Sequence, residues 1–137
     1  LSNTLKIAER CGNVFPTPCD LTPIYPIPSG YPSSIAYLRA MTYKGASFRY
    51  GRLTAPLLQR LEEELTLIED LEYENYFLTA WDIVRWCGRK DQKIRVTGRG
   101  SAADSAVSYS LFLTEVDAFS LRLPFARFMA RAISQLL

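Results

Sequence analysis

The segment "VTGRGSAADSAVSYSL", residues 96–111, decides how the rest of this 137-residue sequence is interpreted. Two glycines flank Arg99, Ser101 follows the second glycine, and a run of small residues then has the composition of a closely packed helix. Just upstream, residues 93–96 ("KIRV") are β-branched and alternate in polarity, which predicts a strand. A strand, a glycine turn and a helix in this order form a recurrent binding site for anions.

Two interpretations of this segment remain open from its chemistry alone. In the first it binds phosphate, with Gly98 and Gly100 allowing close backbone approach, Arg99 giving a bidentate contact and Ser101 a hydroxyl donor. In the second it is a plain strand-to-helix turn. The spacing is neither that of a dinucleotide-binding fingerprint nor that of a Walker loop, because no Lys-Ser/Thr pair follows the glycines.

Composition indicates one ordinary globular domain, with 48% apolar residues, 22% charged residues and a net charge of +2. This charge is too small for binding to nucleic acid by bulk electrostatics, so such binding must depend on a local site. No stretch is apolar enough to span a bilayer, and the first residues lack the apolar core of a signal peptide. We therefore expect a cytoplasmic protein with no membrane partner.

Histidine is absent, which excludes the usual Ser-His and Cys-His nucleophile systems. The three cysteines, Cys11, Cys19 and Cys87, have no metal-type spacing, and their odd number does not indicate a disulfide framework. We expect all three to be reduced thiols.

The N-terminal third divides into a short helix over residues 1–12 and a proline-rich stretch over residues 14–32. That stretch holds six of the eight prolines, which predicts an extended connector. A helix over residues 33–51 follows, capped by Ser33 or Ser34, with Phe48 on its apolar face and Gly45 as a soft point.

Two further amphipathic helices follow. The first begins at Thr54, carries its apolar stripe on Leu58, Leu61, Leu65 and Ile68, and has an acidic run, residues 62–64, that we expect on a solvated face. The second covers residues 75–88, with a buried stripe that includes Phe77, Trp81 and Cys87, and with Trp86 also expected in the core. Residues 102–113 are expected to form one helix of small residues. One or two helical turns around Pro124 and a C-terminal helix complete a predominantly helical α+β fold.

A resemblance adds to these observations. "GRGSAADSAVSY" (residues 98–109) resembles a motif of the bacterial C-family DNA polymerases, the alpha subunits of DNA polymerase III. "NTLKIAERC" is similar to the helix that closes this family's histidinol-phosphatase-like (PHP) domain. "YLRAMTYKGASFRYG" and "LTEVDAFSLRLPFARFM" resemble parts of the palm, in the same order. The joined segments "NYFLTAWDIVRW" and "GRGSAADS" are more similar to the error-prone branch than to the main replicase.

The resemblance implies three regions: residues 1–13 as the terminal helix of a PHP-like domain, 14–32 as a linker, and 33–137 as the start of the palm. The palm would be a partial nucleotidyltransferase fold similar to that of polymerase beta, with a few short strands. Gly98, Arg99, Gly100 and Ser101 would bind the triphosphate of the incoming deoxynucleotide, and Arg127 would lie near the nucleotide. The partners implied are primer-template DNA and other holoenzyme or mutasome subunits.

The sequence also departs from the family pattern. Asp104 stands where Asn or Gly is usual, and its carboxylate would repel a triphosphate, or else simply stabilise the first turn of a helix. Ala126 replaces a glutamate. The carboxylates that bind the two Mg²⁺ ions of nucleotidyl transfer would lie beyond Leu137, so we expect this chain alone to bind no Mg²⁺ and to be inactive. Glu115 and Asp117 are spaced like a metal pair, but we expect them to be structural.

Two alternatives to a polymerase part stay open. The chain could be a non-catalytic nucleotide- or phosphate-binding or scaffold module from a truncated or degenerate polymerase, or a helical domain whose glycine turn is only structural. Six basic residues around the motif could contact phosphate backbones or form a solvated face. They are Arg85, Arg89, Lys90, Lys93, Arg95 and Arg99.

Overall fold

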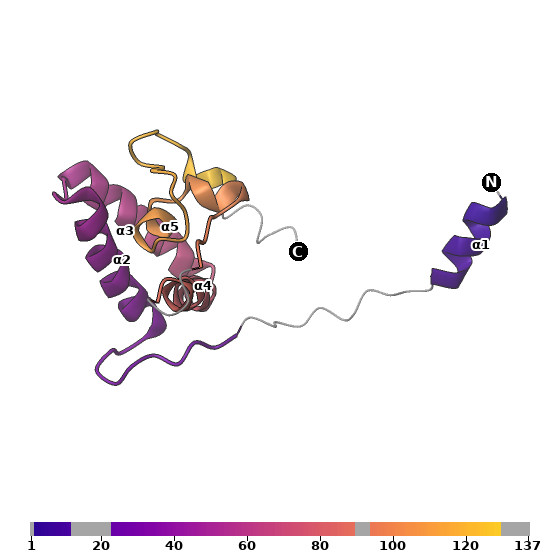
Figure 1. The fold of residues 1–137 in the computed structure, drawn as a ribbon, viewed down its shortest axis with the longest axis horizontal. Coiled ribbons are helices and arrows are strands. Elements are labelled where there is room, and N and C mark those ends of the chain that lie inside the picture. The colour runs from indigo at the N-terminus through magenta and orange to yellow at the C-terminus, as the bar shows by residue number, and fades with distance from the viewer. Residues whose placement is uncertain (1, 12–22, 90–93, 130–137) are drawn as a thin grey trace.

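The computed structural model describes residues 2–11, 23–89 and 94–129, and most of these residues are helical (Figure 1). The elements are α1 (Ser2–Cys11), α2 (Ser34–Tyr50), α3 (Ala55–Asp70), α4 (Glu74–Cys87), the 3-10 helix η1 (Gly100–Asp104), α5 (Ala106–Ser110) and the 3-10 helix η2 (Phe125–Arg127). The prediction of a predominantly helical fold is confirmed. The described ranges contain no strand, so the short strands expected of a palm are not seen there.

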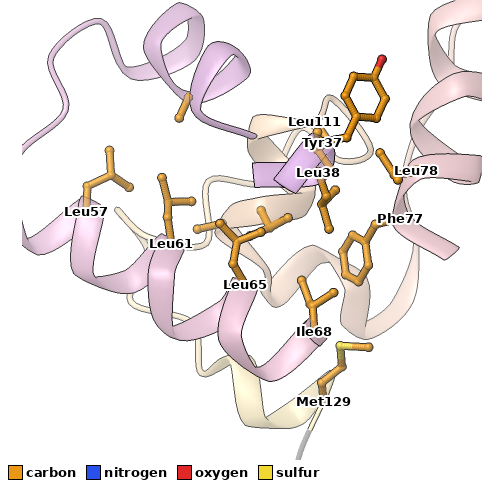
Figure 2. Packing of buried hydrophobic residues seen from close by; sticks show 13 residues of the cluster. Tyr37, Leu38, Leu57, Leu61, Leu65, Ile68, Phe77, Leu78, Leu111 and Met129 are labelled. Carbon is orange, nitrogen blue, oxygen red and sulfur yellow. The ribbon is translucent and has the colours of Figure 1, made fainter. Parts of the chain in front are cut away.

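The hydrophobic core lies between α2, α3, α4 and α5, and α3 contributes the largest share of it. Leu57, Leu61, Leu65 and Ile68 point to the same side of α3 and are almost fully buried (Figure 2). Phe77 and Leu78 of α4 and Leu38 of α2 meet them there. The predicted stripe is correct except at its start, where Leu57 is buried and Leu58 only half-buried.

Helix α5 packs against both α2 and α3, and α2 also packs against α3 and α4 (Figure 1). The approach of α5 to α2 requires Gly45, because a Cβ at this position would lie 1.9 Å from the carbonyl oxygen of Ser110. The expectation that Gly45 is a soft point is therefore wrong, since α2 runs through it without interruption. Gly45 is the position at which α2 and α5 approach each other closely.

Two aromatic residues expected inside the molecule are exposed. Phe48 is 80% exposed, because α5 crosses α2 on the side that carries Gly45 and Thr42. Trp86 is 45% exposed, whereas Phe77 and Cys87 of the same helix are buried as predicted and Trp81 is half-buried. In both helices, apolar residues cover more of the surface than the neighbouring helices bury, so Phe48 and Trp86 at the edge remain exposed.

The helix starts agree closely with the capping residues expected. Ser33 caps α2, its Oγ accepting a hydrogen bond from the Ala36 N–H at 3.3 Å. Thr54 occupies the N-cap position of α3 with Pro56 in the first turn, although its side chain makes no capping hydrogen bond. Helix α2 ends at Gly51, which has a φ of +68° and so a conformation that favours glycine.

Two predicted elements around the glycine motif are wrong. Residues 94–96 are not a strand: in the described ranges no neighbouring strand pairs with them, and Ile94 N–H bonds instead to the Cys87 carbonyl at 3.1 Å. The single helix expected over residues 102–113 is divided at Ser105, whose backbone is extended. Ser105 Oγ accepts from Ser108 N–H at 2.9 Å, so Ser105 is the N-cap of a new helix.

The two ends of the chain are described only in part. Helix α1 forms where predicted and has no buried residue, and residues 23–28, within the proline-rich stretch, have no regular secondary structure. The turns expected around Pro124 are found as η2. A C-terminal helix is predicted after these turns, and residues 130–137, where the chain continues, lie outside the described residues.

Candidate functional site

The glycine motif follows an extended segment and opens η1. Gly98 is packed tightly against the chain that follows α5, since a Cβ there would lie 2.5 Å from the carbonyl oxygen of Leu113. Gly100 has a φ of +74° and open space around it, so its conformation, not its surroundings, favours glycine. One glycine of the motif therefore serves packing and the other serves the turn.

The polar groups of the motif face solvent. Arg99 and Ser101 are both exposed, on either side of Gly100. The N–H groups of Gly100 and Ser101 precede that of Ala102, which donates the first i→i+3 hydrogen bond of η1, so these two have no partner within that helix. A guanidinium, a hydroxyl and backbone donors thus lie together on one exposed turn, which is a donor set suited to an anion.

The N-terminus of α5, which was expected to face a phosphate, faces a side chain of the protein instead. The start of α5 faces the fully buried carboxylate of Glu64 on α3. Glu64 Oε1 accepts from Ala106 N–H at 3.0 Å, and Oε2 accepts from Val107 N–H at 3.0 Å and from the Ser105 hydroxyl at 2.7 Å. An internal anion therefore occupies this helix terminus, which leaves it unavailable to a phosphate.

Glu64 corrects the expectation that the whole acidic run is solvated. Only Glu63 is exposed, and Glu62 is half-buried, where it bonds to Arg39 and Tyr43. The spacing could have shown this, because Glu64 follows Leu61 by three positions and precedes Ile68 by four and so lies on the buried stripe.

Arg60 connects the two segments that carry the predicted site residues. Its Nε donates to Glu64 at 2.6 Å, and its Nη2 donates to the carbonyl oxygens of Asp104 at 3.0 Å and Leu123 at 2.8 Å. Asp104 ends η1, and Leu123 directly precedes the turn that leads into η2. One side chain of α3 therefore holds the glycine motif and the Arg127 segment next to each other.

Arg127 lies beside the motif through an ion pair. Its Nε is 3.5 Å from Oδ2 of Asp104, and η1 packs against η2. The guanidinium remains largely in solvent, with its side chain 70% exposed, whereas the side chain of Asp104 is only 10% exposed. The structure thus brings Arg127 to the end of η1, whose start carries Arg99, Gly100 and Ser101.

Glu115 and Asp117 are engaged within the protein, as their predicted structural role requires. Glu115 forms a bidentate pair with Arg49, at 3.0 and 3.1 Å, and the Arg49 guanidinium also stacks on the ring of Tyr109. Asp117 accepts from the Tyr50 hydroxyl at 3.0 Å and from the N–H and hydroxyl of Ser120.

These contacts shift two pKa values in opposite directions. Burial alone would raise the pKa of Asp117, but hydrogen bonds from Ser120 and Tyr50 outweigh burial and hold this pKa below its ordinary value. Burial, followed by the hydrogen bond to Asp117, raises the pKa of Tyr50 above its ordinary value.

A sequence model of the family described as "Bacterial DNA polymerase III alpha NTPase domain" matches residues 36–135. The chain belongs to this family. The prediction drawn from the glycine motif and its neighbours is confirmed, and the match extends over α2, α3, α4 and α5 as well as the motif itself.

Relatives within the DNA polymerase III alpha family include proteins of both names expected. The chain is 50% identical over 131 residues to an error-prone DNA polymerase of Symbiobacterium thermophilum, which covers 95% of this chain and 12% of that protein. It is 36% identical over 127 residues to DNA polymerase III subunit alpha of Treponema pallidum, and this match covers 93% of the present chain and 11% of that protein. It is 42% identical over 138 residues to an error-prone DNA polymerase of Pseudomonas paraeruginosa, and this match covers 96% of the present chain and 13% of that protein. The chain thus spans only 11–13% of the length of these relatives.

The structure also shows the surroundings of the cysteines and of the basic residues near the motif. Cys11 is exposed, Cys87 is buried, both are free thiols, and Cys19 lies outside the described residues. In the basic group, Arg85 stacks on Trp81 and lies 3.9 Å from Asp82. Three more of that group are exposed: Arg89, Arg95 and Arg99. Lys90 and Lys93 lie outside the described residues.

The acidic side chains and the helices of residues 2–11, 23–89 and 94–129 bear on metal and membrane binding. No three His, Cys, Asp or Glu side chains in these ranges gather closely enough to hold a metal ion. No helix in the described part of the chain has the length and apolarity to cross a bilayer.

Sequence reasoning missed Arg60 and Glu64, the two residues that hold the site together. Glu64 was detectable from its position on the stripe. Arg60 precedes it by four positions and would have followed as its partner. The two carbonyl contacts of Arg60 carry no sequence signal, because they depend on backbone groups from two other segments.

Proposed function

We propose that this chain contributes the triphosphate-binding part of a DNA-directed DNA polymerase, the activity named in its relatives. One observation carries the proposal. Arg60 binds the carbonyls of Asp104 and Leu123 at once, so the exposed motif and Arg127 lie against each other although they are far apart in sequence. Family membership supports the same role for the motif.

Each site residue has a defined task in this proposal. Gly98 packs the turn onto the chain after α5, and Gly100 gives it its left-handed conformation. The N–H groups at the start of η1 and the Ser101 hydroxyl donate to phosphate oxygens. Arg99 and Arg127 supply the charge that offsets the triphosphate, each with a planar group that can bind two oxygens.

Three acidic side chains are already paired within the protein, and the described residues contain no cluster of three His, Cys, Asp or Glu that could hold Mg²⁺. Asp104 pairs with Arg127, Glu115 with Arg49, and Asp117 with Tyr50 and Ser120. Nucleotidyl transfer by two Mg²⁺ ions requires free carboxylates a few ångströms apart. We therefore infer that a complete polymerase would supply the Mg²⁺ ligands from other segments and that the 137-residue chain alone is inactive.

In the complete enzyme, the partners we propose are deoxynucleoside triphosphates, primer-template DNA and the other subunits of a replicative holoenzyme or mutasome. The reaction would serve bacterial replication or damage-tolerant synthesis, and it would take place in the cytoplasm. These proposals rest on the family resemblance and the composition of the sequence, together with the polymerase names of the relatives, which are much longer than this chain.

The test is a titration of the 137-residue chain with fluorescently labelled dATP. Arg99→Ala should weaken binding about tenfold, the value of one charge-assisted hydrogen bond to phosphate. Arg52→Ala is the matched control, since Arg52 is an exposed arginine in the connection from α2 to α3. Equal weak binding by wild type and Arg99→Ala would favour a scaffold module.

Primer extension with Mg²⁺ tests the second part of the proposal. We expect none from the isolated chain. Extension by the wild type that is lost in Ser101→Ala would show that this chain holds the complete catalytic machinery, and our assignment of the Mg²⁺ ligands to other segments would be wrong.

A further inference from the structure

Asp104 was expected either to repel a triphosphate or to stabilise a helix start, and the structure points to a different role. We propose that Asp104 is a positioning residue that holds Arg127 by its Nε, so that the two Nη groups remain available to phosphate oxygens beside the glycine motif. The phosphate contact rests on the proposed function, whereas the anchoring of Arg127 does not.

The geometry of the ion pair supports this role. The contact joins Arg127 Nε to Asp104 Oδ2 at 3.5 Å and so involves the inner edge of the guanidinium. The contact is made by Nε and not by either Nη, and the side chain of Arg127 is 70% exposed, so its outer fork can be reached by a ligand. A guanidinium has five N–H donors in a rigid plane, so it can bind a carboxylate on one edge and a phosphate on another.

Asp104 is held firmly enough to act as an anchor. Its backbone carbonyl accepts from Arg60, which is itself bound to the buried Glu64. Its Oδ2 is buried and accepts no hydrogen bond within the described part of the chain. A buried carboxylate oxygen without a hydrogen-bond donor is costly, so the nearby guanidinium is a strongly favoured partner.

The segment of Arg127 is fixed at the same point. Arg60 also binds the carbonyl of Leu123, and the Arg127 N–H donates to the Pro124 carbonyl at 3.2 Å within η2. The backbone at both ends of the ion pair is therefore positioned by one residue of α3. The Arg127 side chain is largely exposed, and its ion pair with Asp104 is the contact that restrains it.

The charge of Asp104 is offset by this arrangement. Paired with Arg127, the carboxylate adds little net repulsion to a triphosphate, whereas an unpaired Asp104 would repel it. The positioning role therefore makes a distinctive prediction: the sign of the effect of Asp104→Asn depends on whether Arg127 is present.

The experiment is a double-mutant cycle of triphosphate affinity in the 137-residue chain, with labelled dATP as the probe. In the wild-type background, Asp104→Asn should weaken binding about threefold to tenfold, because Arg127 is no longer held. In the Arg127→Ala background, the same change should strengthen binding about threefold, because an unpaired negative charge is removed. Thermal unfolding of every variant shows whether it is folded.

Asp82→Asn is the matched control, because Asp82 is an exposed aspartate next to an arginine on α4, and it should leave affinity unchanged. A gain of affinity from Asp104→Asn in both backgrounds would overturn the positioning role in favour of simple repulsion. A loss in both backgrounds would overturn it in favour of a general structural role.

A second readout does not require nucleotide. The Nε–H signal of Arg127, assigned by its absence from the Arg127→Lys spectrum, should show restricted motion in ¹⁵N relaxation in the wild type and larger-amplitude motion in Asp104→Asn. Unchanged relaxation overturns the anchor. Wild-type protein that binds no triphosphate overturns the proposed function instead, so the two failures are distinguishable.

Discussion

Arg60 Nε and Glu64 Oε1 lie 2.6 Å apart, one turn from each other on α3, and the pair joins that helix to three other segments of the fold. Glu64 binds the start of α5, and Arg60 binds the end of η1 and the approach to η2. The glycine motif is therefore held in place by α3, although none of the residues predicted to bind phosphate lies on that helix. Four predictions follow from this and neighbouring contacts.

Glu64→Ala should strongly destabilise the domain. Four donors lose their acceptor, and the Arg60 guanidinium is left without its carboxylate in a largely buried site. Removing one partner of a buried ion pair costs about 3–5 kcal/mol. Denaturant unfolding of Glu64→Ala and of Glu63→Gln measures this directly. The exposed Glu63 should change stability by no more than about 0.5 kcal/mol, and similar losses in both variants would contradict the role of Glu64.

Arg60→Lys should weaken triphosphate binding although the charge is kept. A lysine has a single nitrogen, which cannot reach Glu64 and two carbonyl oxygens in the geometry of a guanidinium. We expect a loss of about 1–3 kcal/mol in stability, because buried acceptors lose their donor, and a several-fold weaker affinity for labelled dATP. Arg52→Lys, at an exposed site, should resemble wild type in both measurements.

Gly45→Ala should destabilise the contact between α2 and α5. Alanine is favoured over glycine by about 1 kcal/mol in a helix, but its Cβ would lie 1.9 Å from a backbone oxygen that cannot move alone. Overpacking of this kind costs about 1–3 kcal/mol, so the net change should be a loss. Gly88→Ala is the control, because its Cβ meets the nearest atom at 3.5 Å. An equal or higher melting temperature for Gly45→Ala would show that the helices can separate freely.

The stability of the domain should depend on Tyr50 at alkaline pH. Burial and the hydrogen bond to Asp117 raise the pKa of Tyr50 above its ordinary value of 10.0. The unfolded chain therefore loses this proton near pH 10.0 while the folded chain keeps it, so the contribution is full below that pH and falls as pH rises beyond it. Tyr50→Phe should lose stability less steeply above pH 10.0 than wild type, whereas the exposed Tyr76→Phe should follow the wild-type curve.

The long helices could be predicted because each obeys one local rule over several turns. Leu61, Leu65 and Ile68 repeat at helical spacing, and Ser33 is a strong capping residue. The same reasoning failed where the decision lies outside the segment. Residues 94–96 have the pattern of a strand but no neighbouring strand in the described ranges, and Ser105 starts a new helix because Glu64 receives its first N–H groups.

For the candidate site, the sequence identified the exposed motif and its family, but not the residues that support it. Arg99 and Ser101 stand out because glycines flank them. The charge of Asp104 was visible in the sequence, whereas its partner Arg127, in a different segment, was not. Packing between distant segments is the information that a local pattern lacks.

The contact between Arg60 and Asp104 joins residues 44 positions apart, which has a consequence for how the protein acquires its shape. During synthesis, α3 leaves the ribosome before the glycine motif does, and it can assemble with α2 while the motif is still being made. The motif can then fold against α3, where the Arg60 guanidinium and the Glu64 carboxylate already lie next to each other. A peptide containing only residues 94–111 would lack these two partners, so we expect it not to adopt the conformation of the motif.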